Sequence, residues 1–156
     1  MTVRKSVAAL VILALATGVA VLGYLHLGDR KLDDLRATAL ASATQFTEEL
    51  ATYDFDDSGA NLDRVTAVST DEFAQTYRDV SGKLQGLLTS GQGSSTGHVV
   101  TAGIVEMDDR NALVAVFLDQ EVRNLSVPDG RTDSSRMVIG LERVGDRWLL
   151  ASAEPR

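Results

Sequence analysis

Residues 112–118 read ALVAVFL, seven apolar residues in succession, and the six residues that follow read DQEVRN. A short apolar run rich in β-branched and aromatic residues predicts a strand, here one buried on both faces. Beyond Leu118 the pattern changes to one in which Asp119, Glu121 and Arg123 share a side. The strand is therefore expected to leave the core at this end and reach solvent.

Further strands are expected on both sides of this run. Residues 98–107 are rich in β-branched residues, and Asp108–Asn111 has the composition of a turn. A loop with Pro128 and the Asp129-Gly130 dipeptide is predicted over Leu125–Asp133. The later signals are an alternating strand (Met137, Ile139, Leu141), a hairpin turn (Gly145-Asp146) and a closing strand (Trp148–Ala153). We therefore predict an antiparallel meander of about four strands within residues 98–154.

Helical periodicity precedes the sheet, over residues 29–89. The first segment, residues 29–51, has one apolar stripe and is expected to pack on its own domain. After a break at YDFDDSG, residues 53–59, Asn61 is the expected N-cap of a second, short helix. Ser69 and Glu72 have capping-box spacing ahead of a third helix. Its apolar side carries residues at helical spacing: Phe73, Tyr77, Val80, Leu84 and Leu87.

The residues between the helices and the sheet read SGQGSSTG, 90–97, and are expected to form a flexible linker. Helices followed by strands predict an α+β domain, with the helices packed on one face of a curved antiparallel sheet.

Residues 7–27 contain no charged residue and predict a transmembrane helix about 31 Å long. A cleaved signal peptide ending near Ala14-Leu15-Ala16 is the alternative, but the apolar run continues well beyond Ala16, which favours an uncleaved anchor. The positive charges on the two sides of the span nearly balance, whereas a long C-terminal domain can be translocated largely regardless of its charge. We therefore expect a single-pass protein of the cell membrane, with residues 1–6 as a cytoplasmic tail and residues 28–156 as an extracytoplasmic domain.

Composition excludes several classes of function. The chain has no cysteine, so it has no disulfide, cysteine-ligated metal site or thiol nucleophile. From residue 28 onward, 13 basic residues stand against 22 acidic ones, a net charge of −9. Such a surface repels phosphate backbones, and we expect no nucleic-acid partner.

No set of residues predicts catalysis. An isomerase-type site would need a base beside an apolar pocket and a donor to the developing oxyanion. The residues of suitable chemistry are Tyr53, Asp54, Tyr77, His98, Asp119 and Trp148, and each has a structural explanation as a core, turn or strand residue. The acidic loop 54–59 lacks the glutamate of a calcium loop, because Val65 stands at the twelfth position. We expect no catalytic residue, no metal and no cofactor.

Four stretches follow the predicted span in a fixed order: Tyr53-Asp54-Phe55, Asp71-Glu72-Phe73 with Tyr77, Val116-Phe117-Leu118-Asp119-Gln120, and Gly145-Asp146-Arg147-Trp148-Leu149-Leu150 with Glu154-Pro155. In these stretches and their order the chain resembles the Mce-associated membrane proteins of actinobacteria. The resemblance implies a cone-shaped domain similar to nuclear transport factor 2 and an accessory role beside Mce complexes, which move lipids or sterols. The VirB8-like scaffold proteins of type IV secretion channels share the plan of one span followed by such a domain.

Together these features predict a non-catalytic, membrane-anchored accessory or scaffold protein. Its expected partners are the bilayer, Mce-type transporter subunits and a lipid or sterol, with a VirB8-like assembly scaffold as the alternative. A ketosteroid-isomerase-like enzyme or a binder of small apolar ligands is the less favoured reading. If the domain has an apolar pocket, we expect Tyr77, Phe117, Met137 and Trp148 to line it.

Overall fold

The computed structural model describes residues 31–156. The chain divides after Leu35, and the unit Arg36–Arg156 carries all the strands described. The predicted span, residues 7–27, the tail, residues 1–6, and residues 28–30 lie outside the described residues. No helix within residues 31–156 is long and apolar enough to cross a membrane.

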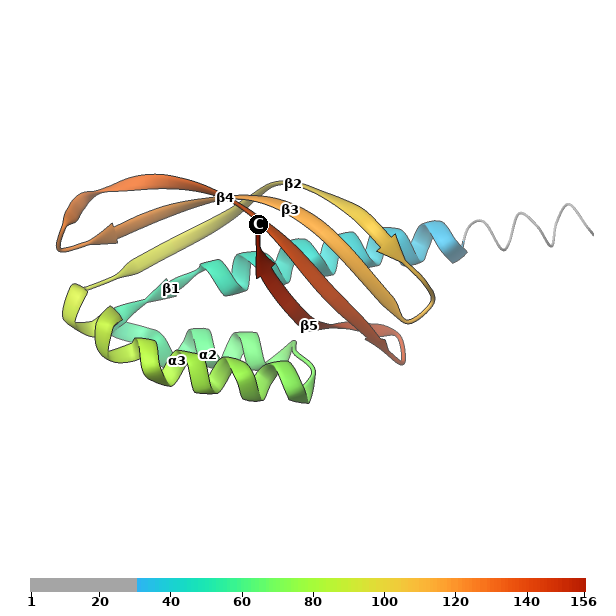
Figure 1. Ribbon diagram of the computed structural model, residues 1–156, viewed down its shortest axis with the longest axis horizontal. Helices are drawn as coiled ribbons and strands as arrows, with labels where there is room; N and C mark the ends of the chain where they lie inside the picture. Colours follow the sequence, from blue (N-terminus) through green and yellow to red (C-terminus); the bar gives the residue numbers. More distant parts are fainter. Residues whose placement is uncertain (1–30) are drawn as a thin grey trace, which may run out of the picture. The chain divides into compact units, whose positions relative to one another are not determined.

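A curved antiparallel sheet of five strands organises Arg36–Arg156 (Figure 1). The strands lie in the sheet in their sequence order. They are β1 (Tyr53–Asp54), β2 (Ser94–Met107), β3 (Asn111–Asn124), β4 (Val127–Val144) and β5 (Arg147–Pro155). The predicted α+β class, with helices packed on an antiparallel sheet, is therefore confirmed. The predicted number of strands was one too few, because β1 is two residues long and too short to show a period.

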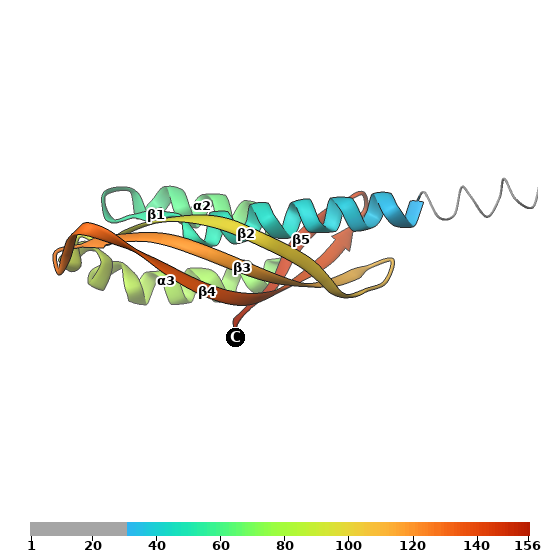
Figure 2. The same cartoon turned by 90° about the horizontal axis from the view of Figure 1, so that it is seen from above.

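Alternate residues of β3 point to opposite faces of the sheet. Ala112, Val114, Val116 and Leu118 are at most 2 % exposed, whereas Phe117 between the last two is 49 % exposed. The helices lie on one side of strands β2–β4 (Figures 1 and 2), and the buried set marks that side, which we call the inner face. The prediction that ALVAVFL is buried on both faces was therefore wrong, because the opposite, outer face is not covered by the described part of the chain.

The N-terminal helix, residues 31–51, packs on the inner face through its part after Arg36. Ala39, Ala43 and Phe46 are buried there, and their small or flat side chains let the helix lie close to the sheet. The indole N–H of Trp148, on β5, donates to Thr38 Oγ1 over 3.1 Å. This contact ties the helix to the far end of the chain.

Two further helices, α2 (Ser58–Ala67) and α3 (Asp71–Gly91), follow β1 and a 3-10 turn, η1 (Phe55–Asp57). The N-cap of α2 is Asp57, whose carboxylate accepts from Ala60 N, so the prediction of Asn61 as the cap was wrong. Asn61 instead lies within α2 with its side chain buried, and its side-chain amide donates to the backbone carbonyl of Glu49.

The cap of α3 is Thr70, whose hydroxyl accepts from Phe73 N, and not Ser69 as predicted. The Ser69 hydroxyl is occupied elsewhere, since it donates to Val65 O over 2.7 Å. At the same junction, Leu150 of β5 exchanges backbone hydrogen bonds with Val68 and Thr70, which fixes the start of α3 against the sheet.

The predicted linker, residues 90–97, is not one. Its first residues complete α3, and Gln92 ends that helix in the left-handed conformation, with φ 50°. Its last four residues already belong to β2. Gly97 packs against Ala51, the last residue of the N-terminal helix, where a side chain would not fit. Glycine and serine here serve close packing rather than flexibility.

The predicted loop over residues 125–133 is likewise mostly strand. The β3–β4 turn is only Leu125-Ser126, and Asn124 Oδ1 closes it by accepting from Ser126 N and Val127 N. Gly130, which suggested a turn, lies within β4 at φ +81°. The residues whose composition favours a loop here form a short turn and an irregular part of the β3–β4 strand pairing.

Candidate functional site

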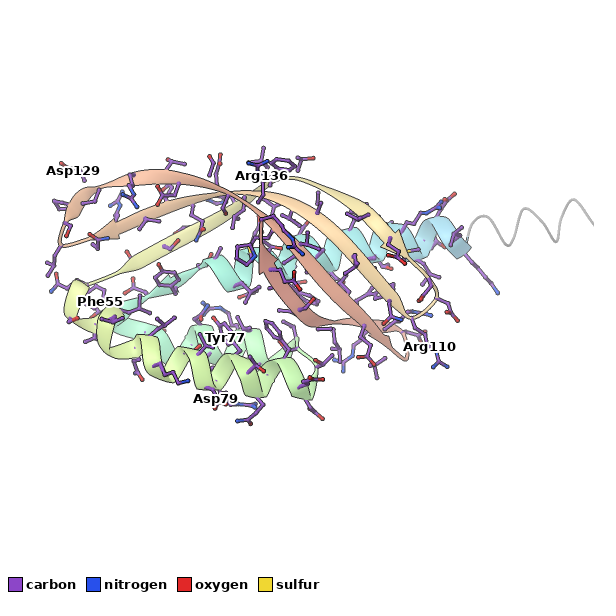
Figure 3. The ribbon with its side chains drawn as sticks, in the orientation of Figure 1. Phe55, Tyr77, Asp79, Arg110, Asp129 and Arg136 are labelled. Carbon is purple, nitrogen blue, oxygen red and sulfur yellow. The ribbon has the colours of Figure 1, made fainter. Side chains whose placement is uncertain are left out.

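An apolar groove of about 380 Å³ lies between α3 and the end of the N-terminal helix. Leu50 and Tyr53 form one wall, Leu62 of α2 lies on another, and the second half of α3 supplies the rest. The lining residues from α3 are Tyr77, Arg78, Val80, Ser81, Gly82, Leu84, Gln85 and Leu88. Figure 3 shows Tyr77 on α3, on the side of that helix that faces the sheet.

Tyr77 and Asn61 form the polar part of this groove. The Tyr77 hydroxyl donates to Asn61 Oδ1 over 2.6 Å, and Asn61 Nδ2 donates to the carbonyls of Glu49 and Thr52 over 2.8 Å each. The amide of Asn61 therefore joins α2, α3 and the end of the N-terminal helix at one point. This network holds the groove's polar wall in one arrangement.

Burial changes the ionisation of both tyrosines in the groove. Burial raises the pKa of Tyr53 above its ordinary value. It also raises the pKa of Tyr77, against the opposing effects of hydrogen bonds to Ser81 and Asn61 and of the Arg64 charge. Both hydroxyls are therefore neutral donors at physiological pH.

The outer face of the sheet is a second surface of functional interest. Phe117 lies at its centre, directly between Thr101 of β2 and Arg136 of β4 in the strand register. Leu113, further along β3, is 38 % exposed, and the two bulge residues of β2, Val100 and Val105, are more than 60 % exposed. In Figure 3, Arg136 lies on the side of the sheet away from the helices.

The structure does not bring the four predicted pocket residues together. Only Tyr77 lines the groove. Trp148 is 4 % exposed in the core, and Met137 lies opposite Val116 in the register, on the inner face. Phe117 points to the other side of the sheet. A single pocket lined by all four was therefore the wrong expectation, because strand alternation places neighbouring apolar residues on opposite faces.

The residues weighed for an isomerase-type site are also dispersed. Tyr53 and Tyr77 line the groove, Trp148 is in the core, and His98 and Asp119 face each other across β2 and β3. The Asp119 carboxylate accepts from the Ser134 hydroxyl over 2.6 Å. Asp54 is at the surface, where its Oδ1 accepts from Asp56 N.

None of the residues that line the groove is acidic or a histidine, so the groove itself offers no carboxylate or imidazole base. Across residues 31–156 no group of three or more histidine, aspartate or glutamate side chains is placed to hold a metal ion.

Sequence reasoning missed most of the groove. Leu50, Leu62 and Leu84 each belong to an apolar helical pattern, which predicts a core residue and not a pocket. Arg78 adjoins Tyr77 in sequence, and nothing in the local pattern shows that both border one hollow. The groove exists only because segments from three helices meet.

Comparison with known proteins gives a family. A family model described as "Uncharacterized protein Rv1363c/MT1408-like" matches residues 1–141. The uncharacterized protein Rv1362c of Mycobacterium tuberculosis is 28 % identical over 158 residues, which cover 94 % of this chain and 69 % of that protein.

Solved structures share the fold. An IcmL-like type IV secretion system protein from Legionella pneumophila superposes with a TM-score of 0.64 at 10 % identity, over 78 % of this chain and 91 % of that one. CagV, a VirB8 homolog of the type IV secretion system of Helicobacter pylori, gives 0.61 at 6 % identity, over 76 % and 96 %. An Ntf2-like protein involved in plasmid conjugation gives 0.50 at 18 %, over 79 % and 39 %. At such identities the likeness is one of fold.

Proposed function

This chain belongs to the Rv1363c/MT1408-like family of uncharacterized proteins, and from its fold and its uncovered sheet face we propose that it is a non-catalytic scaffold protein. In this proposal the domain binds other protein subunits of an envelope assembly in the manner of a VirB8-like protein. The predicted helix over residues 7–27 anchors it in the cell membrane, with the domain outside the cytoplasm.

The observation that carries the proposal is the outer sheet face. Phe117 is half exposed at its centre, with the Arg136 side chain directly opposite on the next strand. Aromatic residues and arginine are enriched at protein interfaces and carry a large share of the binding energy there. Leu113 and Phe117 are exposed apolar residues on this face, and the exposed bulge residues Val100 and Val105 of β2 add apolar surface beside them, as is typical of an interaction surface.

Of the two assemblies that the sequence suggests, the secretion-channel type has the better support. The solved structures with this fold include type IV secretion and conjugation proteins, as their descriptions state. Neither they nor the family description name an Mce transporter. An Mce-type partner therefore rests on the sequence resemblance alone.

The test is co-purification from gently solubilised membranes of the native host, with the tagged full chain and two variants. Phe117→Ser removes the aromatic ring from the outer face. Leu125→Ser is the matched control, because Leu125 is 62 % exposed in the β3–β4 turn. Loss of an interface hot spot lowers affinity by roughly tenfold or more, so Phe117→Ser should lose the partner and Leu125→Ser should keep it.

The identity of the recovered proteins decides between the assemblies. Secretion-channel components that depend on Phe117 would support the proposal as stated. Mce-type subunits with the same dependence would assign the scaffold to the other assembly. Recovery of the chain without any partner that depends on Phe117 would refute the scaffold role of this face.

A further inference from the structure

We infer that the groove between α3 and the end of the N-terminal helix binds a single-chain amphiphile with a carboxylate head. This inference does not rest on the scaffold role, because the groove lies on the helical side of the domain and Phe117 lies on the outer sheet face. It concerns a small ligand, and no protein partner is needed for it.

The groove has apolar walls that no side chain of the domain fills. Val80 and Leu84 both line it, yet each remains 46 % exposed. Leu50, Leu62 and Leu88 add apolar surface from two further directions and from the last turns of α3. Apolar side chains on three sides of an open hollow are what an alkyl chain needs to leave water.

The size of the groove limits the ligand to a small one. Its volume of about 380 Å³ is near the lower end of the range for small-molecule sites. This favours one alkyl chain over a lipid with two chains and a large headgroup.

The charge at the groove selects the head group. Arg78 is the only charged residue that lines it, in a domain whose residues 28–156 carry a net charge of −9. Arg78 is exposed and has no acidic partner in the described part of the chain. A guanidinium binds a carboxylate through two parallel hydrogen bonds, so an anionic head at Arg78 would leave the chain directed along the apolar walls.

Two of the polar side chains that line the groove already have hydrogen-bond partners. The Tyr77 hydroxyl and both ends of the Asn61 amide have partners within the protein. A ligand with several hydroxyl groups would find few free donors or acceptors, whereas an apolar chain with one charged end requires only Arg78.

The experiment is photolabelling of the full chain in phosphatidylcholine nanodiscs with a palmitic acid analogue that carries a diazirine in its chain. Mass spectrometry should find cross-links within α3 and within residues 50–62. Arg78→Gln should lower labelling by the acid by roughly tenfold, the usual value of a charge-assisted hydrogen bond. It should leave labelling by the matched fatty alcohol within about twofold, since the alcohol lacks the charge.

Leu84→Trp, which fills the groove, should abolish labelling by both probes. Leu87→Trp is its matched control, because Leu87 lies on the same helix, is 69 % exposed and does not line the groove. Leu87→Trp should keep the labelling of the unmodified chain, and circular dichroism melts of both variants would verify that they fold.

Three results would overturn the inference. Acid labelling that Leu84→Trp does not change would place the probe elsewhere on the protein. Stronger labelling by a diazirine phospholipid than by the acid would identify a bilayer lipid as the occupant. If neither probe labels the groove and Leu84→Trp instead prevents recovery of protein partners, the groove is a protein-docking site.

Discussion

Replacement of Gly97 by alanine tests how the N-terminal helix is joined to the sheet. A Cβ atom at this position would overlap the Ala51 side chain and would lie 3.3 Å from Leu118 Cδ1 and 3.4 Å from Ala51 Cα. Two of these atoms belong to the helix end itself and cannot rotate away. The Gly97 N–H also donates to Thr52 Oγ1 over 3.1 Å, so movement of the strand would strain that bond as well.

The expected cost follows from two opposing effects. Overpacking of a close contact costs about 1 to 3 kcal/mol, and the rigid neighbours here favour the upper half of that range. Removal of a glycine from a strand interior returns about 0.5 to 1 kcal/mol of backbone entropy. We therefore expect Gly97→Ala to lower the free energy of unfolding by about 1 to 2.5 kcal/mol. For a domain of this size the melting temperature should fall by about 5 to 10 °C.

The assay is thermal and urea unfolding of the full chain in mild detergent, followed by far-ultraviolet circular dichroism. Gly103→Ala is the matched control in the same strand, because a Cβ at Gly103 has no atom within 4 Å, and it should be neutral or slightly stabilising. Ala51→Gly removes the other half of the clash. The Gly97→Ala/Ala51→Gly double variant should be more stable than the sum of the single changes by at least about 1 kcal/mol. Equal effects of Gly97→Ala and Gly103→Ala, or purely additive single changes, would refute the reasoning.

Three further outcomes are expected. Tyr77→Phe should lower the free energy of unfolding, measured in urea, by about 1 to 2 kcal/mol, because it leaves Asn61 Oδ1 without its donor. Tyr53→Phe breaks no such bond and should lower the free energy of unfolding by less. Trp148→Phe removes the hydrogen bond to Thr38 Oγ1 and part of a buried ring, so it should lower the free energy of unfolding by at least about 1 kcal/mol. An unchanged free energy of unfolding would show that this contact does not hold the N-terminal helix on the sheet. The raised pKa values of Tyr53 and Tyr77 give stability that is complete below the ordinary tyrosine pKa and is lost as pH rises through the folded values, because the unfolded chain ionises first. Melts at a series of pH values from about pH 9 upward should therefore show a fall in melting temperature that begins at about pH 10. The Tyr53→Phe/Tyr77→Phe variant should show a smaller fall.

The parts of the fold that follow from local periodicity could be predicted. The apolar spacing of α3 and the β-rich runs of β2, β3 and β5 are properties of each segment by itself, and helices ahead of strands indicate an α+β domain. The predicted cap residues of α2 and α3 were wrong because several polar residues near the start of each helix could serve as the cap. At the start of α3, Ser69 was available by spacing, but its hydroxyl donates to Val65 O, and Thr70 takes the role.

The contact-dependent parts could not be predicted. Gly97 lies in a run whose composition indicates a linker, and only the approach of Ala51 from far along the chain explains why a glycine stands there. Similarly, Leu50, Leu62 and Leu84 each have the pattern of a core residue, and their common groove depends on how completely three helices close. Composition records which residues are apolar, but it does not record whether the space between them is filled.

The run ALVAVFL makes the strongest link between sequence and function. A strand that is apolar on both faces is typical of a sheet covered on both sides, whereas a strand with one solvated face normally alternates apolar and polar residues. β3 has the first kind of sequence, but the helices of the described chain cover only the side of Val114 and Val116. Leu113 and Phe117 are thus apolar where a solvated face would be polar. This mismatch is the physical reason to expect a second layer supplied by another protein, and substitution of Phe117 tests that expectation without disturbing the core.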